Sequence, residues 1–139
     1  MESPALLCID DRPQVLGLRK ATLEPEGFCV KMATCGYTAI KILEENKIAA
    51  VLLEYKQEGM DAEAVAYQIK HRFPTLPVIL VSAYAEMPQR IQWLVDEYVL
   101  KSELPEGLVR IVKRQTQFSR KAPRSEEREE RGDRSVAVA

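Results

Sequence analysis

The run Ala49-Ala50-Val51-Leu52-Leu53-Glu54 joins five apolar residues to a single carboxylate. A short, continuous apolar run without alternation is typical of a strand buried on both faces, as at the centre of a parallel sheet. Ligands of open parallel sheets bind outside the carboxyl ends of the strands. Glu54 is therefore expected at the functional edge of such a sheet.

Three other apolar runs also end in polar side chains. These side chains are two acids, one hydroxyl and one amine: Asp10 and Asp11 after residues 6–9, Ser82 after 77–81, and Lys101 after 97–100. Strands are predicted at residues 5–10, 28–33, 49–54, 77–82 and 97–100, and helices at 37–46, 62–72, 86–95 and 104–118, with a further helix starting at Pro13. Five strands alternating with five helices indicate an α/β fold, a parallel sheet with helices on both faces.

Length and composition suggest one domain followed by a tail. The chain has 139 residues, 46% of them apolar, which is enough for a single core. Residues 1–118 are predicted to form the domain. Charged residues dominate 119–139, which are expected to be disordered or to continue the last helix to about Lys121.

The overall charge gives no reason to expect nucleic acid or an anionic membrane as a partner, since the formal net charge is −1. No apolar stretch approaches the roughly 18 residues that span a bilayer, and the N-terminus lacks the basic region of a secretory signal. A cytoplasmic protein is expected. The three cysteines include no CxxC pair, which argues against a zinc site, and Cys8 is expected in the core.

Five polar side chains are expected to meet at the carboxyl edge of the sheet, namely Asp10, Asp11, Glu54, Ser82 and Lys101. Three carboxylates repel one another unless a divalent cation lies among them, and Mg²⁺ binds to few carboxylates while keeping several waters. The amine and the hydroxyl suit the oxygens of a phosphoryl group.

Over about residues 5–118, the chain resembles the receiver domain of bacterial two-component response regulators. The resemblance rests on four segments taken together: Ile9-Asp10-Asp11, Val51–Glu54 with Gly59-Met60-Asp61, Val78–Ala83, and Tyr98–Lys101. It implies a doubly wound five-stranded parallel sheet of order 2-1-3-4-5, the flavodoxin-like (CheY-like) three-layer sandwich.

The resemblance also implies roles for the site residues. Receivers accept a phosphoryl group from a histidine kinase on an aspartate at the end of the third strand, where this chain has Glu54. The implied ligands of a weak Mg²⁺ site are Asp10, Asp11, Glu54 and the backbone carbonyl of Lys56.

The remaining implied roles concern the phosphoryl group and the switch. Ser82 and Lys101 are expected to bind the phosphoryl oxygens, and Ser82 and Tyr98 are expected to form the conformational switch.

The chain departs from the receiver pattern in four places, one of which is Gln57-Glu58 where receivers commonly have Leu-Pro. Glutamate at position 54 moves the carboxylate outward by about 1.5 Å, and a misplacement of about 1 Å can slow a transfer on the order of 100-fold. Its charge then lies nearer Lys101 and Ser82, where it can imitate a phosphoryl group. Ser102 replaces the usual proline after Lys101, which removes the basis for a cis peptide there. The segment 83–100 is also about one helical turn short, near the face that receivers use for dimers and output partners.

Three functions remain open from the sequence. The first is an atypical receiver, not an enzyme, that signals by contact with a sensor histidine kinase, a downstream signalling protein or a second copy in a homodimer. The second is a phosphorylatable receiver that uses Mg²⁺ and accepts the phosphoryl group on Glu54 or on Asp61. The third is an unrelated small α/β enzyme that uses a metal in the acidic cluster.

Overall fold

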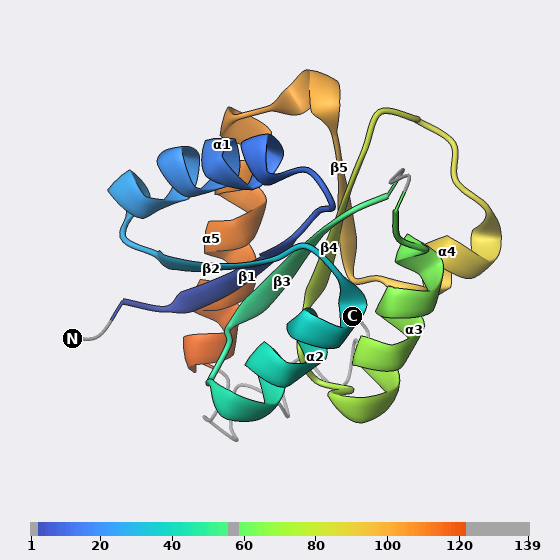
Figure 1. Ribbon diagram of the computed structural model, residues 1–139. Coiled ribbons are helices and arrows are strands. Elements are labelled where there is room, and N and C mark those ends of the chain that lie inside the picture. Colours follow the sequence, from blue (N-terminus) through green and yellow to red (C-terminus); the bar gives the residue numbers. More distant parts are fainter. Residues whose placement is uncertain (1–2, 56–58, 122–139) are drawn as a thin grey trace.

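Five parallel strands form one sheet in the order β2-β1-β3-β4-β5 (Figure 1). The computed structural model describes residues 3–55 and 59–121, with side chains as far as residue 117. The strands are β1 (Ala5–Ile9), β2 (Cys29–Ala33), β3 (Ala50–Glu54), β4 (Val78–Ser82) and β5 (Glu97–Leu100). The predicted fold class, the doubly wound sheet of order 2-1-3-4-5, is confirmed.

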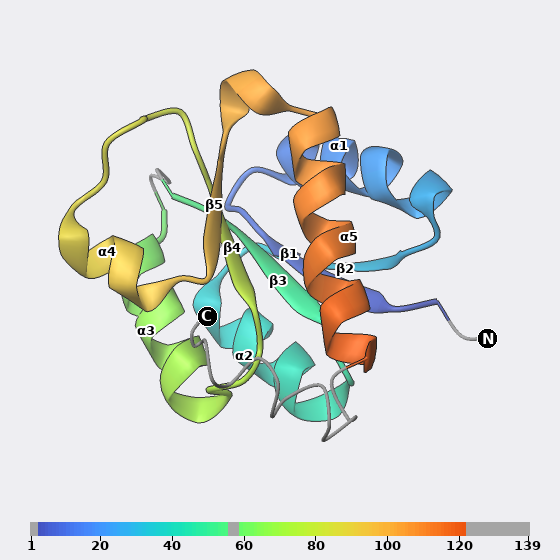
Figure 2. The same cartoon turned by 180° about the vertical axis from the view of Figure 1, so that it is seen from behind.

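Helices cover both faces of the sheet, which gives the three layers (Figures 1 and 2). They are α1 (Pro13–Leu23), α2 (Gly36–Glu45), α3 (Ala62–Arg72), α4 (Gln89–Leu94) and α5 (Glu106–Lys121), with short 3-10 turns η1 (Glu24–Glu26) and η2 (Lys101–Glu103). Helices α1 and α5 pack on one face, and α2, α3 and α4 pack on the other.

The central strand β3 contributes to a hydrophobic cluster on each face of the sheet. Val51 and Leu53 pack with α2, α3 and α4, whereas Ala50 and Leu52 pack with α1 and α5. All five residues of β3 are buried, as the continuous apolar run predicts. Glu54 is buried because it is the last residue of this strand.

Helix α4 starts later than predicted, and the peptide bond after Lys101 agrees with expectation. Helix α4 begins at Gln89 rather than at the predicted Glu86, because Pro88 disfavours helical geometry at the residue before it. Within the described ranges, the one cis peptide bond precedes Pro105, so the bond after Lys101 is trans, as Ser102 leads us to expect.

The last helix, α5, ends at Lys121, which confirms the predicted alternative that this helix continues beyond residue 118. The predictions for Lys56 and for the tail at 122–139 lie outside the described residues.

In the part of the chain that the structure describes, no helix combines the length and apolar character needed to cross a bilayer. Cys8 is buried in the core, as predicted, and its burial raises the pKa of the thiol to about 12.

Candidate functional site

The carboxylate of Glu54 is the centre of an ion-pair network at the carboxyl edge of the sheet. Its side chain is 4% exposed. One oxygen, Oε2, lies 2.5 Å from Lys101 Nζ and 3.8 Å from Arg12 Nη2, and the other, Oε1, accepts a hydrogen bond of 3.4 Å from Arg19 Nη2. Three cationic side chains from three different segments therefore surround one buried anion.

Arg12 extends this network to the acidic pair that follows β1. Its backbone N–H donates to Asp10 Oδ1 at 2.8 Å, and its guanidinium lies 3.2 Å from Asp10 Oδ1 and 3.3 Å from Asp10 Oδ2. The same guanidinium is 4.0 Å from Asp11 Oδ1. The hydrogen bond with Asp10 raises the pKa of Arg12 most; burial opposes it, and the charges of Asp10, Glu54 and Asp11 add to the rise. Arg12 thus contacts each of the three carboxylates predicted to bind a metal.

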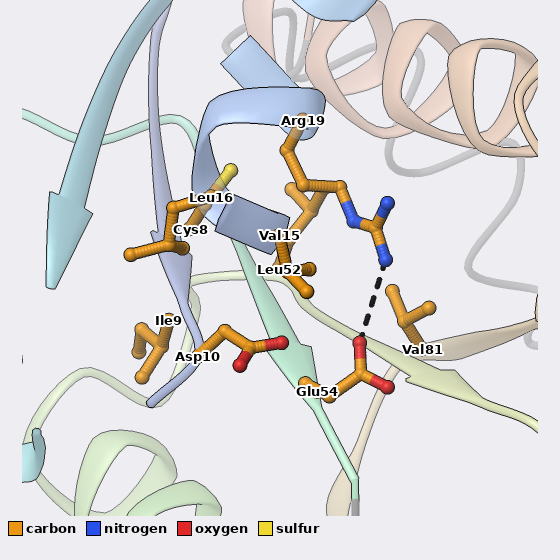
Figure 3. A pocket seen from close by; sticks show the side chains of 9 residues that line it. All are labelled: Cys8, Ile9, Asp10, Val15, Leu16, Arg19, Leu52, Glu54 and Val81. Atoms are coloured by element: carbon orange, nitrogen blue, oxygen red, sulfur yellow. Dashed lines mark hydrogen bonds and ion pairs between the residues drawn. The ribbon is translucent and has the colours of Figure 1, made fainter. Parts of the chain in front are cut away.

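Arg19 reaches Glu54 from helix α1, through a pocket lined by residues of β1, α1, β3 and β4 (Figure 3). Its side chain is only 13% exposed, because its stem lies among apolar residues that include Val15 and Leu52. Long cationic side chains can bury an apolar stem in this way while the charged end finds a polar partner. In Figure 3 the guanidinium of Arg19 points from α1 toward the end of β3, where Glu54 lies.

Lys101 is placed by the turn η2, directly after β5. The side chain of Glu103 accepts a hydrogen bond of 3.0 Å from the backbone N–H of Leu100. This turn lies tightly against α5, since a Cβ at Gly107 would be 2.9 Å from the Cβ of Glu103. Glycine at position 107 therefore lets the turn approach the helix and hold Lys101 toward Glu54.

Among the residues that the structure describes, the formal charges of this site cancel. Asp10, Asp11 and Glu54 contribute −3, and the cations Arg12, Arg19 and Lys101 contribute +3. A buried ionised group is tolerated only when it is paired. The chain supplies this pairing from its own side chains.

The predicted Mg²⁺ ligands that the structure describes, Asp10, Asp11 and Glu54, do not form a metal-binding group. Among residues 3–55 and 59–121, no three Asp, Glu, His or Cys side chains are grouped so as to hold a metal ion. The guanidinium of Arg12 lies between the carboxylates instead. The residues present do not fit Mg²⁺ in this arrangement.

Asp11 binds the backbone of Gly59, which precedes helix α3. Its Oδ2 accepts a hydrogen bond of 2.6 Å from the backbone N–H of Gly59. A Cβ at Gly59 would lie 3.2 Å from that oxygen, which is closer than most side chains allow. The absence of a side chain at position 59 thus permits this short contact.

Asp61, which the sequence suggests as an alternative phosphoacceptor, caps helix α3. Its Oδ1 accepts a hydrogen bond of 3.2 Å from the backbone N–H of Ala64. Aspartate is a preferred N-cap because its oxygen satisfies a helix N–H that has no partner within the helix. The position of Asp61 has a structural explanation.

Ser82 and Tyr98 both bind the loop between β4 and α4. Ser82 Oγ accepts a hydrogen bond of 2.9 Å from Tyr84 N and lies 3.7 Å from Met87 Sδ. The hydroxyl of Tyr98 donates to the carbonyl oxygen of Ala85 at 2.8 Å. The structure therefore brings Glu54 and Lys101 together, as expected, and turns Ser82 toward the same loop that Tyr98 holds.

Sequence reasoning missed the two arginines. Arg12 follows the acidic pair directly, which was a usable signal. Arg19 lies three residues after Leu16 and four before Leu23, both buried, so its position on the inner face of α1 follows from helical spacing. A cation on an inward face predicts a buried anion opposite it.

Comparison with known proteins gives a consistent result. The family model described as the response regulator receiver domain matches residues 6–113. An NtrX-like response regulator of Rickettsia bellii is 31% identical over 114 residues, which cover 78% of this chain and 24% of the relative.

Solved structures agree with the observed fold. The response regulator TrrA of Thermotoga maritima, solved in complex with Mg²⁺-BeF, superposes with a TM-score of 0.73 at 29% identity and covers 81% of this chain and 98% of its own. A CheY-like receiver domain of Methanospirillum hungatei gives a TM-score of 0.76 at 22% identity, with coverage of 86% and 98%. The chain spans about a quarter of the length of the Rickettsia relative.

Proposed function

Since the chain belongs to the response regulator receiver domain family, we propose that it is an atypical receiver in which the fixed charge of Glu54 replaces phosphorylation. Receiver domains of this family act in two-component signal transduction. In this proposal Glu54 occupies the phosphoacceptor position, and the domain signals through contact with another protein.

One observation carries the proposal: the buried carboxylate of Glu54 lies 2.5 Å from Lys101 Nζ. Lys101 is the residue that we assign to the oxygens of a phosphoryl group. Its positive charge is already paired with the carboxylate of Glu54. The same carboxylate also forms an ion pair with Arg19. In-line transfer needs an acceptor oxygen that is free and correctly placed, and this carboxylate is neither.

We assign the switch to Ser82 and Tyr98. Both bind the loop at residues 83–88, Ser82 through Tyr84 and Tyr98 through Ala85. The Glu54–Lys101 pair lies at the neighbouring strand ends, so it can bias the conformation of this loop. The bias cannot exceed the difference in interaction free energy between the two conformations, about 1–3 kcal/mol for typical couplings.

The partner is proposed by class only. A sensor histidine kinase, a downstream signalling protein or a second copy of this chain would contact the loop 83–88 and α4. Mg²⁺ has no part in this proposal, because the residues present do not fit it. Membership of the receiver family leaves no basis for the alternative of an unrelated metal-dependent enzyme.

The test is phosphorylation by acetyl phosphate with MgCl₂, measured by intact-mass spectrometry. We expect wild-type protein and Glu54→Gln to remain equally unmodified, while a receiver with aspartate at the acceptor position gains the mass of a phosphoryl group. An acyl phosphate on the wild type that is absent from Glu54→Gln would overturn the proposal in favour of a phosphorylatable receiver. Label on the wild type that is absent from Asp61→Asn would do the same and would identify Asp61 as the acceptor.

A further inference from the structure

We propose that the guanidinium of Arg12 takes the place of a divalent cation, so that the acidic site is held together by the chain's own arginine and excludes Mg²⁺. This inference rests on the proposed function in that it explains why the same site does not need a metal. Cation binding at this site can be measured without phosphorylation.

The position of Arg12 is fixed by two kinds of contact. Its backbone N–H donates to Asp10 Oδ1 at 2.8 Å, which ties the residue to the end of β1. Its guanidinium then lies 3.2 Å and 3.3 Å from the two oxygens of Asp10. A planar guanidinium presents several donors in a fixed geometry and suits carboxylates better than an ammonium group does.

The same guanidinium also joins the two other carboxylates, at 4.0 Å from Asp11 Oδ1 and 3.8 Å from Glu54 Oε2. A metal ion would be expected to make these three contacts. Arg12 makes them with one positive charge, and Arg19 and Lys101 supply the other two. Each of the three acids thus has at least one cationic side chain within 4.0 Å.

The charges of the six side chains disfavour Mg²⁺ at this site. With all six side chains in place the formal sum is zero, so adding Mg²⁺ would raise it to +2 beside the buried carboxylates of Asp10 and Glu54. Without Arg12 the sum is −1, and Mg²⁺ would bring it to +1 in space that the side chain has left. Like charges about 4 Å apart repel appreciably near a protein surface. Mg²⁺ binding is therefore expected to require the removal of Arg12.

Arg12 can be replaced without opening the core, because its side chain is 49% exposed. The experiment compares wild type with Arg12→Ala, and uses Arg12→Gln, which keeps a polar side chain without the charge, as a second variant. Arg114→Ala is the matched control. Arg114, on α5, is 57% exposed. It donates two hydrogen bonds to the carboxylate of Glu97, on β5.

Mg²⁺ is titrated to about 20 mM, a range that reaches weak sites built from few carboxylates. Binding is followed by amide chemical shifts at residues 10, 11 and 54 in ¹⁵N-labelled protein, against NaCl of equal ionic strength. We expect Mg²⁺ to bind both Arg12 variants at least about tenfold more tightly than the wild type. Mg²⁺ should also raise the melting temperature of the Arg12 variants by about 3–5 °C. Arg114→Ala should bind Mg²⁺ no more tightly than the wild type does. Mg²⁺ should not raise the melting temperature of either protein.

An equal Mg²⁺ response in the wild type and both Arg12 variants, whether all bind or none does, would overturn the inference. A response of Arg114→Ala like that of Arg12→Ala would overturn it too, since any lost arginine would then suffice. Acyl phosphate on the wild type would instead contradict the proposed function. The two claims therefore fail on different measurements.

Discussion

Lys101 Nζ and Glu54 Oε2 lie 2.5 Å apart although strand β4 separates their strands in the sheet. The contact crosses the carboxyl end of β4, where Ser82 begins its hydrogen bonds to the following loop. The extra methylene of glutamate, compared with aspartate, supplies part of this reach. The pair therefore joins β3 to β5 at the position where the loop 83–88 leaves the sheet.

Replacing Lys101 with methionine should lower the free energy of unfolding by about 1–2 kcal/mol. Glu54 is buried and would lose a partner, whereas the two arginines and the partial exposure of the lysine limit the cost. Urea denaturation measures the change. The control is Lys113→Met, which breaks a surface pair with Glu26 and should change stability by less than about 0.5 kcal/mol. Equal effects of the two substitutions would contradict a special role of the Glu54–Lys101 pair.

Asp61 should act as a helix cap rather than as a phosphoacceptor. Asp61→Ala should lower stability by about 0.5–2 kcal/mol, because the N–H of Ala64 loses its partner. Asp61→Asn should retain most of that stability, because asparagine also caps helices. Thermal denaturation separates the two variants. If both were equally destabilised, the cap would not explain the residue.

Tyr98→Phe should loosen the loop 83–88. The substitution removes only the hydroxyl that donates to Ala85, at a cost of about 0.5–1.5 kcal/mol. Hydrogen exchange of the loop amides should become faster. The control is Tyr67→Phe on α3, where the tyrosine is exposed and the same change should leave loop exchange as in the wild type. Unchanged exchange in Tyr98→Phe would separate Tyr98 from the loop.

Restoring phosphorylation should need two substitutions. Glu54→Asp shortens the acceptor, but Arg12 still lies among the carboxylates. Glu54→Asp combined with Arg12→Ala should gain at least about tenfold more acyl phosphate than Glu54→Asp alone, because placement and electrostatics then both suit the transfer. The label should be lost when Lys101→Ala is added. Equal labelling with and without Arg12 would show that the arginine does not limit the reaction.

The sequence allowed the fold and much of the site to be predicted, for a local reason. Continuous apolar runs mark strands buried on both faces, and the polar residue after each run marks the carboxyl edge; Glu54 and Lys101 follow directly. The start of α4 was predicted too early because the effect of Pro88 on the residue before it was not considered.

The arginines were harder to predict because their partners are distant in the sequence. Arg19 and Glu54 are 35 residues apart, and only the packing of α1 on the sheet brings them together. The direction of the Ser82 hydroxyl is likewise set by the loop 83–88, whose conformation no short pattern specifies. Residue types at strand ends are thus local information, whereas their pairing is tertiary.

The central claim is that a fixed charge at Glu54, not a transferred phosphoryl group, sets the state of this site. The most direct measurement compares the amide spectra of wild-type protein with and without acetyl phosphate, and of Glu54→Gln, which is nearly the same size but neutral. We expect Glu54→Gln to shift the amides of the loop 83–88, Tyr98 and Lys101, and acetyl phosphate to leave the wild-type spectrum unchanged. The account would be contradicted if acetyl phosphate shifted the amide signals of the wild type while the loop amides of Glu54→Gln had the same chemical shifts as those of the untreated wild type.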